Sequence, residues 1–273
     1  MARAKRILVQ RHGPVVRVTH WINVLAVSLL LMSGLQIFNA HPALYWGHSS
    51  TFAEPWLAIR MVETADGPRG ITTIGDRFAD TTGVLGWTGF EGDRRNQAFP
   101  GWATIPSWRD LASGRRWHFF FAWLFVINGA VYLATTLISG HLRRNLLPSR
   151  EQLRLRHVLQ EIGAHARLRF PKGEAARTYN VLQKGSYLAV AFVLLPLMVL
   201  TGLCMSPGFN ATVPWLIDLF GGRQGARSVH FLTAGAVVLF VVVHIVMVVA
   251  SGAWNNIRSM VTGRYAIDEE IRP

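Results

Sequence analysis

Two histidines stand inside an apolar segment near the C-terminal end of the chain. His230 and His244 lie within Ser228 to Ser251, which contains no Asp, Glu, Lys or Arg and therefore predicts a membrane-spanning helix. At fourteen residues apart, they are about 40° apart around a helix and about 21 Å apart along it. Imidazole inside a bilayer is costly and needs a partner. Two such side chains on nearly one helix face predict two stacked sites, and axial ligation of two b-type haems is the chemistry that suits neutral imidazole there.

Two further histidines, His20 and His118, stand near the beginning of other apolar segments. Because successive spans alternate in direction, the depth of each histidine follows from the order of the spans. That order pairs His118 with His230 at one depth and His20 with His244 at the other. For His20 alone, a plain interfacial histidine is the competing interpretation.

The apolar segments predict four membrane-spanning helices, at residues 18–38, 117–140, 181–205 and 228–251. We therefore expect an all-α membrane protein, built as a four-transmembrane-helix bundle that forms one domain over residues 1–273. Residues 39–116 would form a long periplasmic loop and residues 141–184 a basic cytoplasmic loop. The third span has no histidine and is expected to pack, with a kink at Pro196.

Composition agrees with a membrane protein. Only 16% of the residues are charged, where a soluble domain has about 25%. Cys204 is the single cysteine, which excludes an intrachain disulfide, an iron–sulfur cluster held by this chain alone and a C-x-x-C-H haem attachment site. Any haem must therefore be bound without a covalent link.

The net charge of +13 first suggests nucleic-acid binding, but its distribution argues against it. The N-terminal arm, the 141–184 loop and the C-terminal tail carry 18 of the 28 Lys and Arg residues and 6 of the 15 acidic residues. Basic loops stay in the cytoplasm, so both termini are expected there. The charge is then a topology signal and no nucleic-acid partner is implied.

Several other residues are weaker candidates. Arg115 and Arg116 precede His118 and could pair with haem propionates, although ordinary flanking charge is as simple an interpretation. His141 is interpreted as interfacial but remains a candidate near a quinone head group, and His41 is interpreted as interfacial. The other histidines lie in polar segments and are expected at the surface: His12, His48, His157 and His165.

Two connecting segments carry further expectations. Residues 39–116 are rich in Pro, Gly and Trp, and predict a loop with short helices that either docks a partner subunit or caps one haem end. Gly34 and Gly129 lie on the faces of His20 and His118 and could let a flat macrocycle approach the backbone. An amphipathic surface helix is predicted at about residues 149–167.

The chain resembles a known family in three motifs: RVTHW at Arg17–Trp21, RRWHF at Arg115–Phe119, and H-x13-H from His230 to His244. They resemble the membrane cytochrome b subunits of bacterial respiratory oxidoreductases, such as those of formate dehydrogenase, nickel–iron hydrogenase and thiosulfate reductase, grouped with the cytochrome b561 superfamily. The resemblance covers all four spans. The sequence FPGWATIPSW at Phe99–Trp108 looks most like the thiosulfate-reductase-type branch, and the loop before His118 is longer than in the other two types.

The resemblance implies a multi-pass protein of the bacterial inner membrane that carries electrons through two haem b groups. Electrons would pass between the quinone pool and a periplasmic oxidoreductase subunit, which in that branch often contains molybdopterin. The resemblance implies axial ligand roles for His20, His118, His230 and His244. It also implies a quinone site near the inner haem, with Arg17, Asn23 and His141 as candidates, and Arg17 as a further propionate contact.

Other functions remain open at this point. A haem-free membrane anchor or assembly subunit would keep the fold, but the occupied ligand positions argue against it. A transporter with proton-relay histidines would be expected to show internal repeats or broken helices. An autonomous transmembrane quinone or ferric reductase would need a second substrate site on the outer face. The leading expectation is an electron-transfer subunit with no catalytic site of its own other than a quinone site.

Overall fold

Four long helical segments dominate the protein. The structure is a computed structural model that describes residues 4–52, 54–167, 169 and 179–270, and it is 58% helical. The segments long and apolar enough to cross a membrane are α1 (Pro14–Phe38), α2 (Leu111–Ile138), α4 to α5 (Val181–Cys204) and α8 (Arg223–Ala250). The prediction of four apolar helices is confirmed. Part of the predicted basic loop, residues 168 and 170–178, lies outside the described residues.

Three of the four helices begin four to six residues earlier than predicted, because charged residues in their first two turns bounded the apolar segments used for the prediction. Helix α1 begins at Pro14, and proline suits the first helical position because the N–H it lacks would have no partner there. Helix α2 begins after Asp110, whose Oδ1 accepts a hydrogen bond of 3.0 Å from the N–H of Ser113. The apolar segments alone therefore do not mark where these helices begin.

The third span is interrupted in the middle. It consists of α4 (Val181–Ala189), a π-helical turn (Val190–Leu194) and α5 (Leu195–Cys204). Asn180 caps its start in a capping box with Gln183. The π-helical turn ends two residues before Pro196, which has no N–H and whose ring clashes with the preceding turn of a regular helix. The irregularity therefore precedes the proline that predicted a kink.

The chain forms two compact units, and each long helical segment contributes to both. The first unit contains Met1–Ile22, Asn128–Pro196 and Gly235–Pro273, and the second contains Asn23–Ile127 and Leu197–Ala234.

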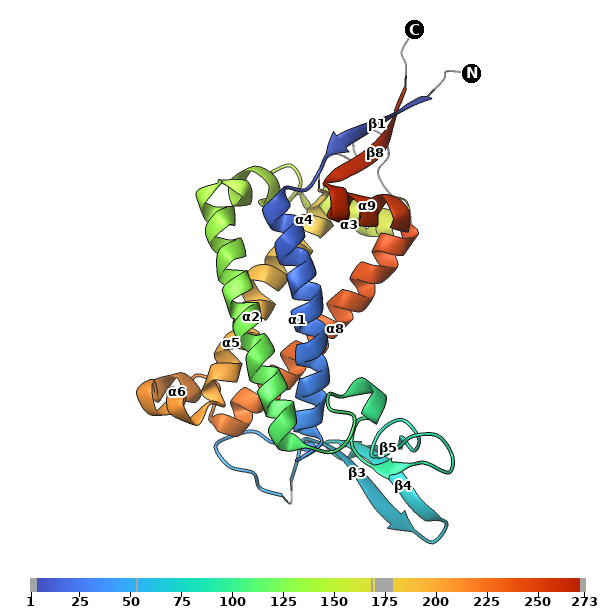
Figure 1. Cartoon of the computed structure of the whole chain (residues 1–273), viewed down its shortest axis with the longest axis vertical. Coiled ribbons are helices and arrows are strands. Elements are labelled where there is room, and N and C mark those ends of the chain that lie inside the picture. Colours follow the sequence, from blue (N-terminus) through green and yellow to red (C-terminus); the bar gives the residue numbers. More distant parts are fainter. Residues whose placement is uncertain (1–3, 53, 168, 170–178, 271–273) are drawn as a thin grey trace. The chain divides into compact units, whose positions relative to one another are not determined.

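In the first unit the two ends of the chain pair with each other. Strand β1 (Ala4–Gln10) and strand β8 (Arg264–Glu270) form an antiparallel ribbon (Figure 1). In its register Gln10 lies opposite Arg264. Helix α9 (Ala253–Thr262) precedes β8 and is tied to α1. Arg17 Nη1 donates to the Val261 carbonyl at 2.6 Å, and Trp21 Nε1 donates to the Met260 carbonyl at 3.1 Å. The predicted surface helix is present as α3 (Leu155–Ala166).

In the second unit the segment 39–116 forms β-structure, so the expectation of short surface helices is wrong for most of it. Strands β2 (Ala43–Leu44), β3 (Leu57–Thr64), β4 (Gly67–Ile74) and β5 (Arg77–Asp80) form an antiparallel sheet, in that order (Figure 1). Strands β6 (Trp87–Thr88) and β7 (Arg95–Asn96) form a second small sheet, followed by a short helical turn, η1 (Gly101–Ala103). The chain is therefore mostly helical and not all-α.

The β3–β4 hairpin has a local signal that the sequence interpretation overlooked. The dipeptide Asp66–Gly67 stands at its turn, and Gly67 has a φ of +102°. Gly67 pairs with Thr64, so Ala65 and Asp66 form the loop, and Gly67 takes the left-handed conformation that favours glycine. Apolar and polar residues alternate only weakly on either side of this turn, so their pattern does not predict strands.

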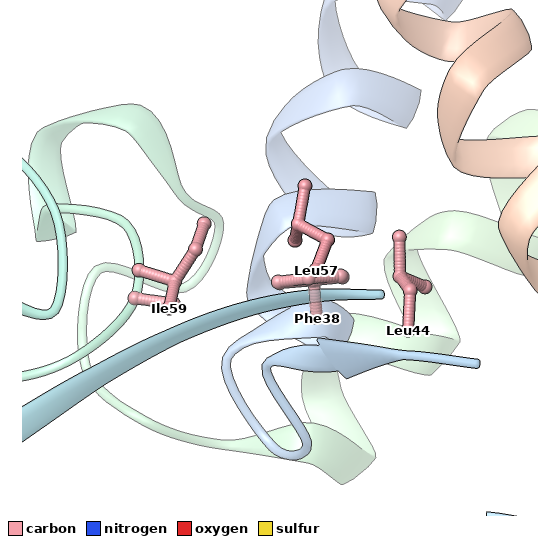
Figure 2. Packing of buried hydrophobic residues seen from close by; sticks show 5 residues of the cluster. Phe38, Leu44, Leu57 and Ile59 are labelled. Atoms are coloured by element: carbon pink, nitrogen blue, oxygen red, sulfur yellow. The ribbon is translucent and has the colours of Figure 1, made fainter. Parts of the chain in front are cut away.

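The sheet meets helix α1 through a small apolar core. Phe38, Leu44, Leu57, Ile59 and Ala98 are each less than 10% exposed and pack together (Figure 2). Phe231 of α8 also packs on this core, with its ring centroid 4.9 Å from that of Phe38. The residue that follows His230 in α8 therefore packs on this core.

Polar contacts fix the same segment to α8. Arg227 donates to the carbonyls of His41 at 2.5 Å and Ala43 at 2.8 Å. Trp56 Nε1 donates to Ser228 Oγ at 2.9 Å, and that hydroxyl donates to the Tyr45 carbonyl at 2.6 Å. Segment 39–116 is thus anchored one turn before His230.

The connection between α5 and α8 contains two short helices, α6 (Pro207–Thr212) and α7 (Trp215–Asp218). Leu216 of α7 packs with Cys204 and Ala226, and these three side chains are almost completely buried. This packing joins the end of α5 to the start of α8 within the second unit.

Candidate functional site

Two of the membrane histidines face each other in the second unit. His118 of α2 and His230 of α8 have ring centroids 6.3 Å apart, with their planes at 63°. His118 stands two turns into α2 and His230 two turns into α8. The structure therefore brings together the pair expected from the order of the spans.

Each of these imidazoles has a hydroxyl beside its Nδ1 atom. His118 Nδ1 lies 3.1 Å from Ser33 Oγ of α1, and His230 Nδ1 lies 2.9 Å from Thr201 Oγ1 of α5. Ser33 and Thr201 are both completely buried. With Nδ1 engaged in this way, Nε2 is the ring nitrogen left to bind a metal.

A glycine follows each hydroxyl residue and packs on the same imidazole. A Cβ added to Gly34 would lie 3.5 Å from His118 Cε1, and one added to Gly202 would lie 3.6 Å from His230 Cε1. Gly34, which lies fourteen residues after His20 on α1, is beside the His118 ring, and its role in letting a macrocycle approach stays a prediction. Gly129 has nothing within 4 Å of an added Cβ.

The first unit holds the other pair. His20 of α1 and His244 of α8 have ring centroids 6.4 Å apart, with their planes at 55°. The Phe240 ring stacks on His244 at 5.7 Å, and the Trp21 ring meets His20 edge-on at 5.4 Å. His20 Nδ1 is buried without a hydrogen-bond partner among the described residues. This nitrogen therefore differs from Nδ1 of His118 and of His230, each of which lies beside a buried hydroxyl.

The spacing of both pairs fits one metal atom between two imidazoles. With bonds of about 2 Å to nitrogens that lie about 1 Å from their ring centres, such rings have centroids about 6 Å apart. No group of three or more His, Cys, Asp or Glu side chains that could hold a metal gathers anywhere in the described part of the chain. Two imidazoles are too few for a bare zinc ion, which takes four ligands in structural sites. They suit haem iron, because the macrocycle provides the remaining ligands.

The arginines proposed as propionate contacts are distributed over both units. Arg115 and Arg116 are exposed on α2; Arg115 lies over the Phe119 ring and Arg116 donates to Ser113 Oγ at 3.0 Å. Arg17 uses Nη1 for the Val261 carbonyl, and its Nε is buried without a partner among the described residues. Their role toward a haem stays a prediction.

His12 was expected at the surface, and that expectation is wrong. It is half-buried in the first unit, where its Nδ1 lies 3.1 Å from the Tyr179 hydroxyl. Burial lowers the pKa of His12 to about 4, with the charges of Arg11, His20, Arg17 and His141 adding to the effect. Burial also raises the pKa of Tyr179. His12 and Tyr179 thus form a neutral polar pair close to His20, which the sequence analysis did not identify.

The remaining histidines have different surroundings. His141 is half-buried, and burial followed by the charge of Arg144 lowers its pKa. His165 is also half-buried, with Nδ1 2.9 Å from the Glu161 carbonyl and Nε2 3.2 Å from Asn180 Nδ2, so it is not a plain surface histidine. His48 is exposed and His157 half-buried. His41 stacks on Tyr45 with centroids 5.6 Å apart.

Comparisons with known proteins agree with the geometry. Residues 11–263 match the family model described as "Prokaryotic cytochrome b561". The chain is 30% identical over 238 residues to "Putative protein-methionine-sulfoxide reductase subunit YedZ1" of Azospira oryzae, covering 87% of this chain and 89% of that protein. No solved structure matches the chain. With four apolar helices and a family match over most of its length, the chain is a multi-pass membrane haem-b protein of electron transfer, and it belongs to the prokaryotic cytochrome b561 family.

Proposed function

We propose that the protein holds two haem b groups, one between His118 and His230 and the other between His20 and His244. The observation that carries the proposal is the spacing of the rings, 6.3 Å in one pair and 6.4 Å in the other. Both values suit two axial imidazoles on one iron atom. Bound haem supplies reversible one-electron oxidation and reduction.

The chain's own residues hold and shield these sites. The four imidazoles would hold the two haem irons, and the apolar helices around them would limit the access of water. Phe240 covers the face of His244, and Trp21 flanks His20. A dry, apolar surrounding favours neutral imidazole, which is the form that binds iron.

We further propose that the electrons travel between quinone and a periplasmic redox enzyme. The relative from Azospira oryzae is named as a subunit of a methionine sulfoxide reductase. By analogy, the partner of this chain would be a reductase that takes electrons from quinol, and a molybdopterin enzyme remains the expected type. The charge distribution supports a periplasmic position for the sheet β2–β5, where this partner would dock.

Quinone is proposed to react near the His20–His244 pair. The half-buried His12, His141 and Tyr179 of the first unit provide polar groups there, together with Arg17. A quinone head group exchanges protons as well as electrons, so ionisable side chains near the site are required. His141 and Arg17 keep the roles that the family resemblance implies for them.

Single histidine variants test the assignment of the two pairs. His230→Ala and His244→Ala should each lose about half of the haem per chain, because each haem would lose one of its two axial ligands. The pyridine haemochrome content of the purified variants measures this. His48→Ala, which removes an exposed histidine, should retain the full content. Unchanged haem in His230→Ala or His244→Ala would contradict the pairing.

A quinol analogue tests the direction of electron entry. Added to the oxidised protein, it should reduce both haems in the wild type. In a His244→Ala variant that keeps the other haem, reduction should become much slower, since the haem nearest the quinone site is missing. Equal rates in the two proteins would show that quinol reacts elsewhere.

A further inference from the structure

The hydroxyls of Ser33 and Thr201 stand where they can control the electronic properties of one haem only. Resting on the proposed function, we propose that they are positioning residues that fix the tautomer of His118 and His230. We also propose that they hold the midpoint potential of the haem between these histidines lower than the imidazoles alone would set it.

The tautomer of each histidine follows from where the hydroxyl protons of Ser33 and Thr201 are used. Ser33 Oγ donates its single proton to the Leu29 carbonyl at 2.6 Å, and Thr201 Oγ1 donates its own to the Leu197 carbonyl at 2.7 Å. A hydroxyl has one proton and two lone pairs. Each hydroxyl is therefore left to accept from the imidazole, and the carbonyls of Leu30 and Met198 are further acceptors at His118 and His230. Both kinds of acceptor favour the tautomer in which Nδ1 carries the proton. The lone pair on Nε2 is then available to iron.

Water has no access to these two hydroxyls. Ser33 and Thr201 are 0% exposed, so solvent cannot replace the imidazole as their partner. Each forms a continuous chain of hydrogen bonds from Nδ1–H to the hydroxyl and on to a helix carbonyl. Bonds in such a chain polarise one another. The imidazole consequently gains electron density at the nitrogen that faces iron.

The same arrangement of a hydroxyl residue and a glycine occurs at both histidines. Ser33–Gly34 on α1 and Thr201–Gly202 on α5 each place a hydroxyl at Nδ1 and a glycine against Cε1 of the facing histidine. A hydroxyl residue followed by glycine therefore packs against the edge of each imidazole that contains Nδ1 and Cε1. Two independent helices that carry the same pair of residues argue for a function of that pair.

The other histidine pair provides the contrast. His20 Nδ1 has no hydrogen-bond partner among the described residues, and His244 has aromatic rings for neighbours. Hydrogen bonding at the second ring nitrogen makes an imidazole a more basic ligand and stabilises the oxidised metal. Removing the hydroxyls should thus raise the potential of the His118–His230 haem and leave the other haem unchanged.

The test is a redox titration of both haems in the purified full-length protein, followed at the α-band. Thr201→Val keeps the shape of the side chain without its hydroxyl, and Thr201→Ser keeps the hydroxyl. Ser33→Ala and Ser33→Thr form the matching pair on α1. The haem between His20 and His244 serves as an internal reference in every sample.

We expect an upward shift of one midpoint in Thr201→Val and in Ser33→Ala, a larger shift in the double variant, and wild-type values in Thr201→Ser and Ser33→Thr. Loss of this one haem in Thr201→Val, with retention in Thr201→Ser, would also support the role of the hydroxyl. Unchanged midpoints in both hydroxyl-free variants, or a shift of the reference haem alone, would overturn the inference. Fewer than two haems in the wild type would instead contradict the proposed function.

Discussion

Single residues around each imidazole decide what that imidazole can do. In the second unit, buried hydroxyls lie beside Nδ1 of His118 and His230, and glycines leave room for the rings. In the first unit, His12 and Tyr179 form a neutral pair near His20. Burial disfavours the charged form of both groups, so the pair stays neutral across the physiological pH range.

At the residue scale we predict that His12 makes stability depend on pH. Its pKa is about 4 in the fold and 6.5 in a model peptide, so the unfolded chain binds the proton first. The contribution of His12 to stability is complete above pH 6.5 and decreases as the pH falls toward 4. Apparent Tm in detergent, measured over this range, should fall less steeply in His12→Gln than in the wild type. His48→Gln should behave as the wild type, and equal slopes in all three proteins would contradict the prediction.

The sequence of helix α8 has to meet several structural requirements at once. It carries His230 and His244, receives the hydrogen bonds that anchor segment 39–116, and begins at a turn where backbones come close together. The spacing of its histidines followed from the sequence alone, since a regular helix has a fixed rise and rotation per residue. Its anchors came from a segment far away in the sequence and could not be inferred.

Glycines of α8 provide a matched test at the element scale. A Cβ on Gly225 would collide with the Phe220 carbonyl, whereas one on Gly235 would have nothing within 4 Å. Gly225→Ala should therefore destabilise the protein by about 1–3 kcal/mol or more, since backbone must move. Gly235→Ala should be neutral or slightly stabilising, because alanine favours helix. Thermal unfolding of the two variants gives the comparison, and an equal Tm for both would contradict the packing described.

Arg227 supports the anchoring of segment 39–116, and its removal should weaken the neighbouring site. Arg227→Met keeps the apolar stem and removes two hydrogen bonds from a charged donor, each worth about 1.5–3 kcal/mol. We expect a lower Tm and faster loss of haem from the His118–His230 pair on dilution into detergent. Arg109→Met, at an exposed position in the same segment, is the control. Wild-type haem retention in Arg227→Met would show that the anchor is dispensable.

At the scale of the whole molecule, the chain is a membrane protein whose two ends lie together. Strands β1 and β8 pair antiparallel, which requires that both lie on one side of the membrane, and four spans satisfy this requirement. Large apolar side chains on the spans remain exposed, such as Trp123 at 69% and Leu239 at 65%. In a bilayer these side chains face lipid.

The orientation of the chain can be tested with introduced cysteines, because the native Cys204 is only 1% exposed. Asp66→Cys in the β3–β4 turn and Arg150→Cys in the basic loop both occupy exposed positions. In intact spheroplasts, a membrane-impermeant maleimide should label Asp66→Cys and should label Arg150→Cys only after lysis. The reverse pattern would invert the proposed topology and move the docking sheet to the cytoplasmic side.

The sequence predicted what depends on local composition and regular geometry. Four apolar segments predicted four helices, and the order of the spans predicted which histidines lie close together. It did not predict the sheet of residues 39–116, whose strands alternate weakly, or the β1–β8 ribbon, which joins segments about 250 residues apart. Ser33 and Thr201 were also missed, because a hydroxyl in an apolar helix has no pattern until its partner helix is known.

The haem content of the purified wild-type protein tests the central claim most directly. A dithionite-reduced minus oxidised spectrum, with pyridine haemochrome quantification against the concentration of the chain, gives the number of haems per polypeptide. The geometry of the two imidazole pairs predicts two haems b. A content of one haem would mean that one pair serves another purpose, and protein from haem-replete cells without haem would contradict the account and favour a membrane anchor.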